Sequence, residues 1–555
     1  MTTTSDEHDD DEGIDTEDDA SDTDGSDNTA DAEDDASDTD GSDNTADAED
    51  DAPIDNGDEA TDTEDDATTA ADPAVENDLV LVSNRQPYSH EYDDDGDVVV
   101  DRPAGGLTAG LDPVMQRAHG TWIAWGDGEA DREVTGDDGT VRMPPEDESY
   151  ALKRIWLSDD EVQAYYYGYS NRVLWPLCHG GVWQTEYANR HWRRYQQVNG
   201  KFADAVVDAI GDDSIVWFQD YHFALAPRQV REQVPDALLA HFWHITWPGW
   251  DTFRACPQAA DILEGLLAND LLGFHVERYC YNFLDCVDEA FDDAFVDYDD
   301  NRVQYEGHTT HVAAFPLGID ANSVAQSAAD TDEESWRSFK RDRGIPEESM
   351  VALGVDRLDY TKGIVERLKA LEEFWRTRPE WQGELTYVQK ADESRSLIPE
   401  YQNLQSNVEE AVERINERFG TDEWTPVVYI DDWLESDALN ALYRYSDVML
   451  VSALRDGMNL VAKEFVASQI DDDGVLVLSN QTGAHEQLGD QSVSINPYDT
   501  QEFANAIEEA VTMEETERHR RMRTLRERVA DADLDAWMAD VFAEIEEIRE
   551  NRTVR

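Results

Sequence analysis

The sequence predicts an α/β protein with two doubly wound domains, preceded by a disordered acidic tail. Three observations support this fold class. From Leu79 onward, short apolar runs alternate with helical patterns, which is typical of parallel sheets covered by helices. A polar stretch near 320–345 divides these runs into two groups. The first 78 residues lack the apolar content that a core requires.

The N-terminal segment 1–78 is strongly acidic and repetitive. It contains 34 acidic residues and no lysine, arginine or aromatic residue. The stretch Glu17–Asp24 recurs from Glu33 and starts again at Glu49. A chain of low hydrophobicity and one sign of charge cannot bury enough surface to offset its conformational entropy. We therefore expect a disordered tail, serving as a solvated spacer or as a docking segment.

Continuous apolar runs predict the strands, because parallel strands are buried on both faces. The first group comprises Leu79–Val82, Ser214–Phe218, Leu238–His244, Leu271–Phe274 and Val312–Phe315. The second group comprises Val351–Val355, Leu385–Gln389, Val427–Ile430, Val448–Val451 and Val475–Leu478. The last helical pattern places four apolar residues on one face, namely Trp537, Val541, Ile545 and Ile548.

These patterns predict Rossmann-like domains at 79–325 and 326–532, and a helix at 533–555 that packs back on the domains. Ligands of doubly wound sheets bind at the carboxyl ends of the strands. We therefore expect the two domains to face each other across a cleft that holds the functional residues.

The charge balance excludes one class of partner. The chain carries 127 acidic and 43 basic residues, including only seven lysines, for a net charge of −84. An acidic, lysine-poor surface is typical of proteins from salt-loving organisms, where salt screens the self-repulsion. Nothing resembles a basic stripe, which argues against a nucleic-acid partner.

The sequence also predicts a soluble, cytoplasmic protein with no membrane partner. It has no apolar run of about 18 residues and no basic-then-apolar signal at its N-terminus. The four cysteines, Cys178, Cys256, Cys280 and Cys286, lack metal-binding spacing, which predicts buried thiols in a reducing compartment. The sequence leaves a homo-oligomer open.

The segment after the apolar run Val448–Val451 indicates a ligand site. Gly457 would let the backbone turn tightly, and Asn459 is a good N-cap for the helix that follows. The free N–H groups of that helix suit a phosphate. Asp456 and Glu464 are acceptors suited to hydroxyls, so the pattern indicates a nucleotide sugar. The alternative is an ordinary capped turn.

A second motif, at 357–363, follows the first strand of the second domain. Arg357 and Lys362 could both reach the cleft, where two cations would stabilise a departing diphosphate. The alternative is surface charge followed by a helix cap. In a chain with seven lysines, the presence of Lys362 and Lys463 in the two glycine-turn motifs favours function.

The first domain offers polar residues and glycines at its strand ends. Gly105 and Gly106 permit close approach of the backbone to a phosphate or sugar, although a plain turn is the usual role of such a pair. Asp220 and His244 end neighbouring strands and could orient sugar hydroxyls, with a structural histidine as the alternative. Aromatic residues could stack on sugars or lie in the core; these are Tyr165, Tyr166, Tyr167, Tyr169, Trp122, Trp125 and Trp175.

Taken in order, these motifs resemble those of the trehalose-6-phosphate synthases. The resemblance rests on Ser83-Asn84-Arg85, Gly105-Gly106, Asp220-Tyr221-His222 and the segments 357–363 and 455–464. That family, glycosyltransferase family 20, has the GT-B architecture and moves glucose from a nucleotide diphosphate glucose to glucose 6-phosphate with retention. The resemblance covers nearly everything from Leu79 onward, and its last two motifs are highly specific.

The resemblance implies a role for individual residues. It assigns the donor to Gly105, Gly106, Arg357, Lys362, Asp456, Gly457, Met458, Asn459, Leu460, Val461 and Glu464. It assigns the acceptor to Arg85, Tyr166, Trp175, Asp220 and Arg395, with the two arginines clamping the 6-phosphate. The residues closest to the chemistry would be Asp220, His244, Arg357, Lys362 and Asp456.

The resemblance also implies the reaction. Glucose would leave as an oxocarbenium-like species, and the departing phosphate oxygen would take the acceptor's proton on the same face. No metal and no cofactor would take part besides a nucleotide-sugar co-substrate, for which UDP-glucose is the first choice. GDP-glucose and ADP-glucose stay open as donors. A separate phosphatase would act on the product, because too little chain follows Ile548 for a phosphatase domain.

Two alternatives remain open at this stage. A related synthase would use another acceptor, such as glycerol 3-phosphate, and a non-catalytic homologue would sense a sugar phosphate. Arg85, Tyr166 and Arg395 together favour a sugar-phosphate acceptor. One departure from the family lies after His244, where Thr246 and Trp247 replace the more usual Pro and Phe.

Overall fold

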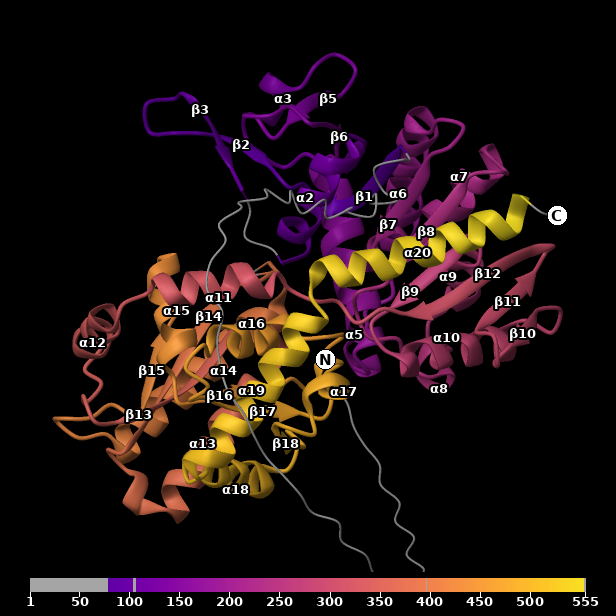
Figure 1. Ribbon diagram of the computed structural model, residues 1–555. Helices are drawn as coiled ribbons and strands as arrows, with labels where there is room; N and C mark the ends of the chain where they lie inside the picture. The colour runs from indigo at the N-terminus through magenta and orange to yellow at the C-terminus, as the bar shows by residue number, and fades with distance from the viewer. Residues whose placement is uncertain (1–77, 103–105, 396, 554–555) are drawn as a thin grey trace, which may run out of the picture. The chain divides into compact units, whose positions relative to one another are not determined.

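The chain folds as two mostly parallel sheets with helices around them, and the predicted α/β class is confirmed (Figure 1). This computed structural model describes residues 78–102, 106–395 and 397–553. The predicted acidic tail lies outside the described residues except for Asp78, and Gly105 also lies outside them.

The first sheet has ten strands in the order β10-β11-β12-β9-β8-β7-β1-β4-β6-β5. Neighbours from β12 to β6 pair in parallel, while the edge strands β5, β10 and β11 pair antiparallel. The strands are β1 (Leu79–Arg85), β4 (Thr121–Trp125), β5 (Thr140–Met143), β6 (Tyr150–Ile155), β7 (Ile215–Gln219), β8 (Leu238–Phe242), β9 (Leu271–Phe274), β10 (Phe295–Asp297), β11 (Arg302–Tyr305) and β12 (His308–Ala314).

The second sheet has six parallel strands in the order β15-β14-β13-β16-β17-β18. They are β13 (Met350–Arg357), β14 (Leu385–Asp392), β15 (Val427–Ile430), β16 (Val448–Val451), β17 (Val475–Ser479) and β18 (Val493–Ile495). The order reverses between β13 and β16. Parallel sheets bind ligands at such a switch point, outside the carboxyl ends of the strands.

Helices lie between the strands of both sheets. The first part contains α2 (Gly106–Ala118), α3 (Asp131–Val134), α4 (Asp159–Glu161), η1 (Val162–Leu174), α5 (Trp175–Cys178), η2 (Val182–Gln184), α6 (Asn189–Ala209), η3 (Tyr221–Phe223), α7 (Ala226–Gln233), α8 (Trp250–Phe253), α9 (Ala259–Leu266) and α10 (Glu277–Ala290). The second contains α11 (Ala321–Asp330), α12 (Glu333–Asp342), η4 (Tyr360–Lys362), α13 (Ile364–Thr377), η5 (Pro379–Trp381), α14 (Pro399–Phe419), α15 (Ser436–Tyr445), α16 (Leu460–Ser468), α17 (Ala484–Leu488), α18 (Thr500–Val511) and α19 (Glu515–Asp531).

Burial on both faces explains why the strands read as continuous apolar runs. Along β1, Val80 and Val82 join one hydrophobic core, and Leu79 and Leu81 join another. Successive side chains of a strand point to opposite faces, so both faces of the first sheet are covered. All four cysteines are buried and free, as predicted.

Several strands were not predicted, and β4 and β6 show why. In β6, Arg154 is buried because it pairs with the carboxylate of Asp131 at 2.8 Å. β4 is apolar from Trp122 to Trp125 and was overlooked; Trp122 is buried, and its indole N–H donates to the Ser83 hydroxyl at 2.8 Å. In β6, a paired polar residue therefore occupies a position that composition alone does not mark as strand.

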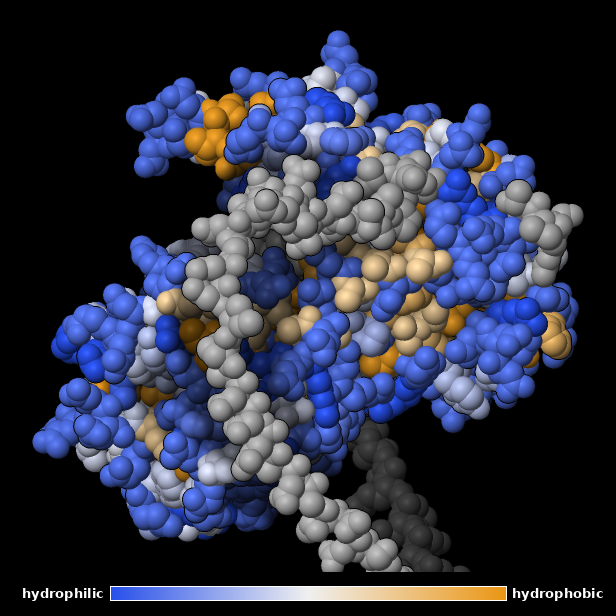
Figure 2. Space-filling model, in the orientation of Figure 1, coloured by the Kyte–Doolittle hydropathy of each residue, from blue (hydrophilic) through white to orange (hydrophobic). Residues whose placement is uncertain are grey.

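A two-stranded hairpin, β2 (Ser89–Tyr92) with β3 (Val98–Asp101), stands apart from both sheets. Its exposed Tyr92, Val98, Val99 and Val100 form an apolar patch on a face that is otherwise mostly hydrophilic (Figure 2). No helix among the described residues is long and apolar enough to cross a membrane.

The last helix, α20 (Leu534–Thr553), lies against the first sheet (Figure 1). The ring of Trp537 lies 5.4 Å from that of Trp217 and 5.1 Å from that of Phe242. Its indole N–H donates to the carbonyl of Phe315 at 3.2 Å. The packing expected of this apolar face is therefore present, while the domain boundaries stay predictions.

We predict that Trp537→Ala lowers the free energy of unfolding by about 3–5 kcal/mol, because it removes a buried aromatic side chain and leaves a cavity. Chemical denaturation measures this change. Glu547→Ala alters an exposed position of the same helix and is the control. Equal stability of the two variants would contradict the packing role of α20.

Candidate active site

The loop after β16 begins the site, and the structure confirms that Asn459 caps the helix that follows. Asn459 has φ +84°, and its side-chain oxygen accepts from the N–H of Ala462 at 3.0 Å. Asparagine tolerates this left-handed backbone better than most residues do. The cap fixes the start of α16 and aims its free N–H groups toward the carboxyl end of the sheet.

Gly457 serves a different purpose from the tight turn that we expected. Its φ is not in the left-handed region, which Asn459 occupies instead. A Cβ on Gly457 would lie 2.1 Å from the carbonyl oxygen of His244, just after β8. The hydroxyl of Tyr279 also donates to the carbonyl of Asp456 at 3.2 Å. Glycine is therefore needed for close approach between the two halves of the chain.

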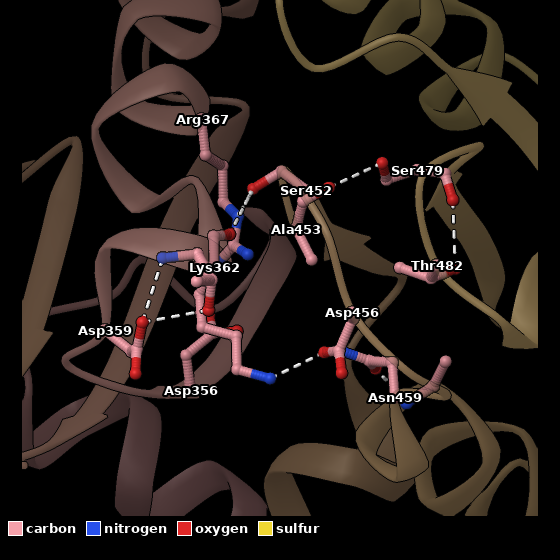
Figure 3. Close-up of polar contacts among 12 residues, drawn as sticks. Asp356, Asp359, Lys362, Arg367, Ser452, Ala453, Asp456, Asn459, Ser479 and Thr482 are labelled. Carbon is pink, nitrogen blue, oxygen red and sulfur yellow. Dashed lines mark hydrogen bonds and ion pairs between the residues drawn. The ribbon is translucent and has the colours of Figure 1, made fainter. Parts of the chain in front are cut away.

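An ion pair joins the two predicted donor motifs (Figure 3). Nζ of Lys362 lies 2.6 Å from Oδ2 of Asp456, which also accepts from the side-chain amide of Asn459 at 3.0 Å. Burial raises the pKa of Asp456, but Lys362 and the Asn459 hydrogen bond hold it below its ordinary value. These contacts favour the charged carboxylate form of Asp456.

A buried polar network holds these loops at the strand ends (Figure 3). The guanidinium of Arg367 donates to Asp356 at 2.6 Å and to the Ser452 hydroxyl at 2.9 Å. Gly363 has φ +66°, and a Cβ there would lie 2.1 Å from the carbonyl oxygen of Ser452. The N–H of Leu454 donates to the carbonyl of Thr361 at 2.7 Å. These contacts therefore tie the loops after β13 and β16 to each other.

Other predicted donor residues surround this ion pair. Arg357 ends β13 with an exposed side chain, and within the described part of the chain it makes no ion pair. Glu464 is half-buried in α16 and accepts from the Tyr443 hydroxyl at 3.0 Å, while burial raises its pKa. Leu460 and Val461 form the first turn of α16, and Met458 precedes it.

Lys463 departs from our expectation for the lysines of the glycine-turn motifs. Its side chain is buried, and Nζ donates to the carbonyl of Leu317 at 2.6 Å. Burial lowers its pKa to about 7. Lys362 alone of the two lysines stands at the carboxylate of Asp456. Gly106 begins α2 in the first part of the chain.

The predicted acceptor residues form a second cluster. The guanidinium of Arg85 lies 5.5 Å from the ring centre of Tyr166, whose hydroxyl it approaches to 3.4 Å. Arg395, from the other half of the chain, lies 4.1 Å above the ring of Trp175. Burial raises the pKa of Tyr166, but Arg395 and Arg85 bring it below its ordinary value. Arg85 and Arg395 therefore both lie near the Tyr166 hydroxyl. Arg85 also forms an ion pair with Asp127 at 2.8 Å.

Asp220 occupies a strained position at the end of β7. Its φ is +71°, and Oδ1 accepts from the N–H groups of Tyr221 at 2.9 Å and His244 at 3.2 Å. Burial raises its pKa to about 7, although these hydrogen bonds, Arg395 and Arg357 lower it. Strain of this kind is typical of functional sites. The ring of His244 hydrogen-bonds Gln219 at 2.8 Å, and burial lowers its pKa.

The segment that departs from the family lies in the core. Trp247 is buried, and its ring lies 4.6 Å from Phe253 and 5.1 Å from Phe283. Its indole N–H donates to the sulfur of Cys286 at 3.4 Å, and the Thr246 hydroxyl donates to the carbonyl of Cys178 at 2.5 Å. Thr246 and Trp247 therefore contact buried residues in the first part of the chain.

Sequence reasoning missed three residues that complete the acceptor cluster. Asp359 and Tyr401 both hydrogen-bond Arg395, and the Tyr221 hydroxyl lies 3.4 Å from its Nη2. Asp359 and Tyr221 belong to the motifs at 357–363 and 220–222. Tyr401 lies in a helical pattern without any site signal, so the sequence could not have revealed it.

Comparison with known proteins agrees with this geometry. A family model described as glycosyltransferase family 20 matches residues 77–547. The chain belongs to glycosyltransferase family 20. It is 37% identical over 467 residues to a trehalose-6-phosphate synthase of Mycobacterium avium, covering 83% of this chain and 93% of that protein.

Two solved structures resemble this family 20 chain. A trehalose-6-phosphate protein of E. coli bound with UDP-2-fluoro glucose gives a TM-score of 0.76 at 31% identity, covering 84% of this chain and 99% of that one. A UDP-forming α,α-trehalose-phosphate synthase of Burkholderia xenovorans in complex with glucose 6-phosphate gives a TM-score of 0.75 at 29% identity. The match covers 85% of this chain and 100% of that one. The GT-B architecture is thereby confirmed.

We predict that Gly457→Ala lowers the glycosyl transfer rate about 100-fold, because the new Cβ pushes the Asp456 loop away from His244 and small misplacements of reacting groups cost that much. Steady-state kinetics measures the rate. Gly211→Ala is the control, since a Cβ there meets no atom closer than 3.5 Å. An unchanged rate in Gly457→Ala would contradict the need for close approach.

The variant Asp220→Asn tests the raised pKa of Asp220 through its effect on the free energy of unfolding. Because the folded-state pKa of Asp220 is about 7, the folded chain keeps a proton that the unfolded chain has lost above about pH 4. The wild type therefore loses stability as pH rises from about 4 to 7, and the loss is complete above pH 7. Asparagine keeps an oxygen acceptor and tolerates the positive φ.

We expect Asp220→Asn to be more stable than the wild type at pH 8 by roughly 1–4 kcal/mol, since one pKa unit corresponds to about 1.4 kcal/mol. The difference should shrink toward pH 4. Denaturation midpoints at several pH values measure it. A variant that is less stable than the wild type at pH 8 would contradict the raised pKa.

Proposed function

We propose that this chain transfers glucose from UDP-glucose to glucose 6-phosphate with retention, giving trehalose 6-phosphate. The observation that carries this proposal is the joining of two cation-bearing clusters. One pairs Lys362 with Asp456, and the other brings Arg85 and Arg395 to Tyr166. Membership of family 20 and the ligands of the solved relatives support the same two substrates.

In the donor part, Arg357 and Lys362 would bind the diphosphate. Arg357 is exposed and has no ion pair within the described ranges, while Lys362 would exchange Asp456 for a phosphate oxygen. The Asp456 carboxylate would then be free to accept from the hydroxyls of the transferred glucose. Glu464, half-buried in the same helix, would bind the ribose.

In the acceptor part, Arg85 and Arg395 would clamp the 6-phosphate, with Tyr166 donating its hydroxyl. Guanidinium groups suit this task because they form paired hydrogen bonds with phosphate. Trp175 would hold Arg395 in place through its ring face. Asp220 would meet acceptor hydroxyls with Oδ2, because Oδ1 already accepts two backbone N–H groups.

The chemistry needs positioning and charge stabilisation from the protein. The bond from C1 of glucose to the diphosphate oxygen breaks, and a bond from C1 to the acceptor oxygen forms on the same face. The departing phosphate oxygen takes the acceptor's proton. Arg357 and Lys362 would stabilise the charge that develops on that oxygen. We keep the prediction that no metal ion takes part.

Three further predictions stay proposals. We propose a cytoplasmic location, a salt-adapted surface and a separate phosphatase that acts on the product. The acidic composition supports the second of these, because high salt screens repulsion among exposed charges.

A donor-by-acceptor matrix at high salt tests the proposed function. Release of nucleotide would be measured with UDP-, GDP- and ADP-glucose against glucose 6-phosphate and glycerol 3-phosphate. We expect the fastest release from UDP-glucose with glucose 6-phosphate. No release in any combination would instead support a non-catalytic sensor of sugar phosphate.

We predict that Lys362→Ala and Arg357→Ala each lower turnover by at least about 100-fold, because each removes a cation that stabilises the leaving diphosphate. The nucleotide-release assay measures turnover, and circular dichroism checks that each variant is folded. Lys369→Ala is the control, since its exposed ammonium pairs with Glu366 on α13. Turnover at the wild-type rate in either variant would refute the donor assignment.

A further inference from the structure

One carboxylate stands between the donor and acceptor clusters. Asp359 is fully buried on the turn before Lys362, and its two oxygens have different partners. Oδ1 accepts from the backbone N–H of Thr361 at 3.0 Å and from its hydroxyl at 2.9 Å. Oδ2 accepts from Nη1 of Arg395 at 2.9 Å and from the hydroxyl of Tyr401 at 3.0 Å.

The Oδ1 contacts fix the turn that presents Lys362. The N–H of Lys362 donates to the carbonyl of Asp359 at 3.0 Å, which closes the turn. The carbonyl of Thr361 accepts from Leu454, so the same turn is tied to the loop that carries Asp456. The place of the Lys362 ammonium therefore depends on Asp359.

The Oδ2 contacts fix Arg395. This residue has φ +48°, and its side chain is only 6% exposed. Its Nη1 also donates to the hydroxyl of Tyr401 at 2.6 Å. A buried guanidinium is strongly destabilised when its counter-charge is removed. Asp359 is the carboxylate that pairs with it, so the orientation of Arg395 over Trp175 also depends on Asp359.

We propose that Asp359 is a positioning residue that couples the two substrates. A diphosphate that binds Lys362 and a sugar phosphate that binds Arg395 would favour the same placement of this carboxylate. Each ligand would therefore strengthen the binding of the other, by the same factor in both directions. The inference rests on the proposed function, because it takes the two ligands from it.

Binding calorimetry on the full chain at high salt tests the coupling. UDP would be titrated with and without saturating glucose 6-phosphate, and the reverse titration would follow. We expect UDP to bind about 5- to 150-fold more tightly when glucose 6-phosphate is present, which is the usual range of such coupling.

Two variants test how much each carboxylate oxygen of Asp359 contributes to the coupling. Thr361→Val removes a hydrogen bond on the donor side, and Tyr401→Phe removes one on the acceptor side. We expect each to reduce the coupling at least 3-fold. Each variant should also affect the substrate on the opposite side. Thr361→Val should raise the KM for glucose 6-phosphate, and Tyr401→Phe should raise the KM for UDP-glucose. Tyr445→Phe, which loses a hydrogen bond to Thr331, should keep the wild-type coupling.

Each contrary result has a distinct meaning. A wild-type chain that binds both ligands but shows the same UDP affinity with and without glucose 6-phosphate would overturn the coupling and leave the proposed function standing. Unchanged coupling in both Thr361→Val and Tyr401→Phe would also overturn it. A wild-type chain that binds neither ligand would overturn the proposed function and this inference together.

Discussion

The ion pair between Lys362 and Asp456 is the interaction on which the site depends. It joins the loops after β13 and β16, which are neighbours where the strand order of the second sheet reverses. Both groups are held by their surroundings: the lysine by its turn, and the carboxylate by Asn459. In the proposed function, a diphosphate replaces the carboxylate at Lys362 and frees Asp456 for sugar hydroxyls.

High salt acts differently on this site and on the rest of the protein. The net charge of −84 makes the exposed surface repel itself, and dissolved ions screen that repulsion. Arg395 and Asp359 are buried together, where ions screen a charge pair much less. Arg395, one of the cations proposed to bind phosphate, can therefore keep its geometry at high salt.

The positions of the main strands along the chain could be predicted because burial on both faces leaves a clear apolar signal, whereas their order in each sheet could not. Asn459 was predictable as a cap because capping is local. Gly457 was misjudged because its constraint comes from His244, which is more than 200 positions away in the sequence. Tyr401 could not be found for a different reason: Arg395 is only six residues away, but the helical pattern of α14 carries no site signal.

The stereochemistry of the product tests the central claim most directly. Proton NMR of the reaction between UDP-glucose and glucose 6-phosphate at high salt would identify the linkage and both anomeric centres. The account predicts one non-reducing disaccharide phosphate, with both centres in the α configuration and one UDP released per molecule. Free glucose, or a β linkage at the transferred sugar, would contradict it.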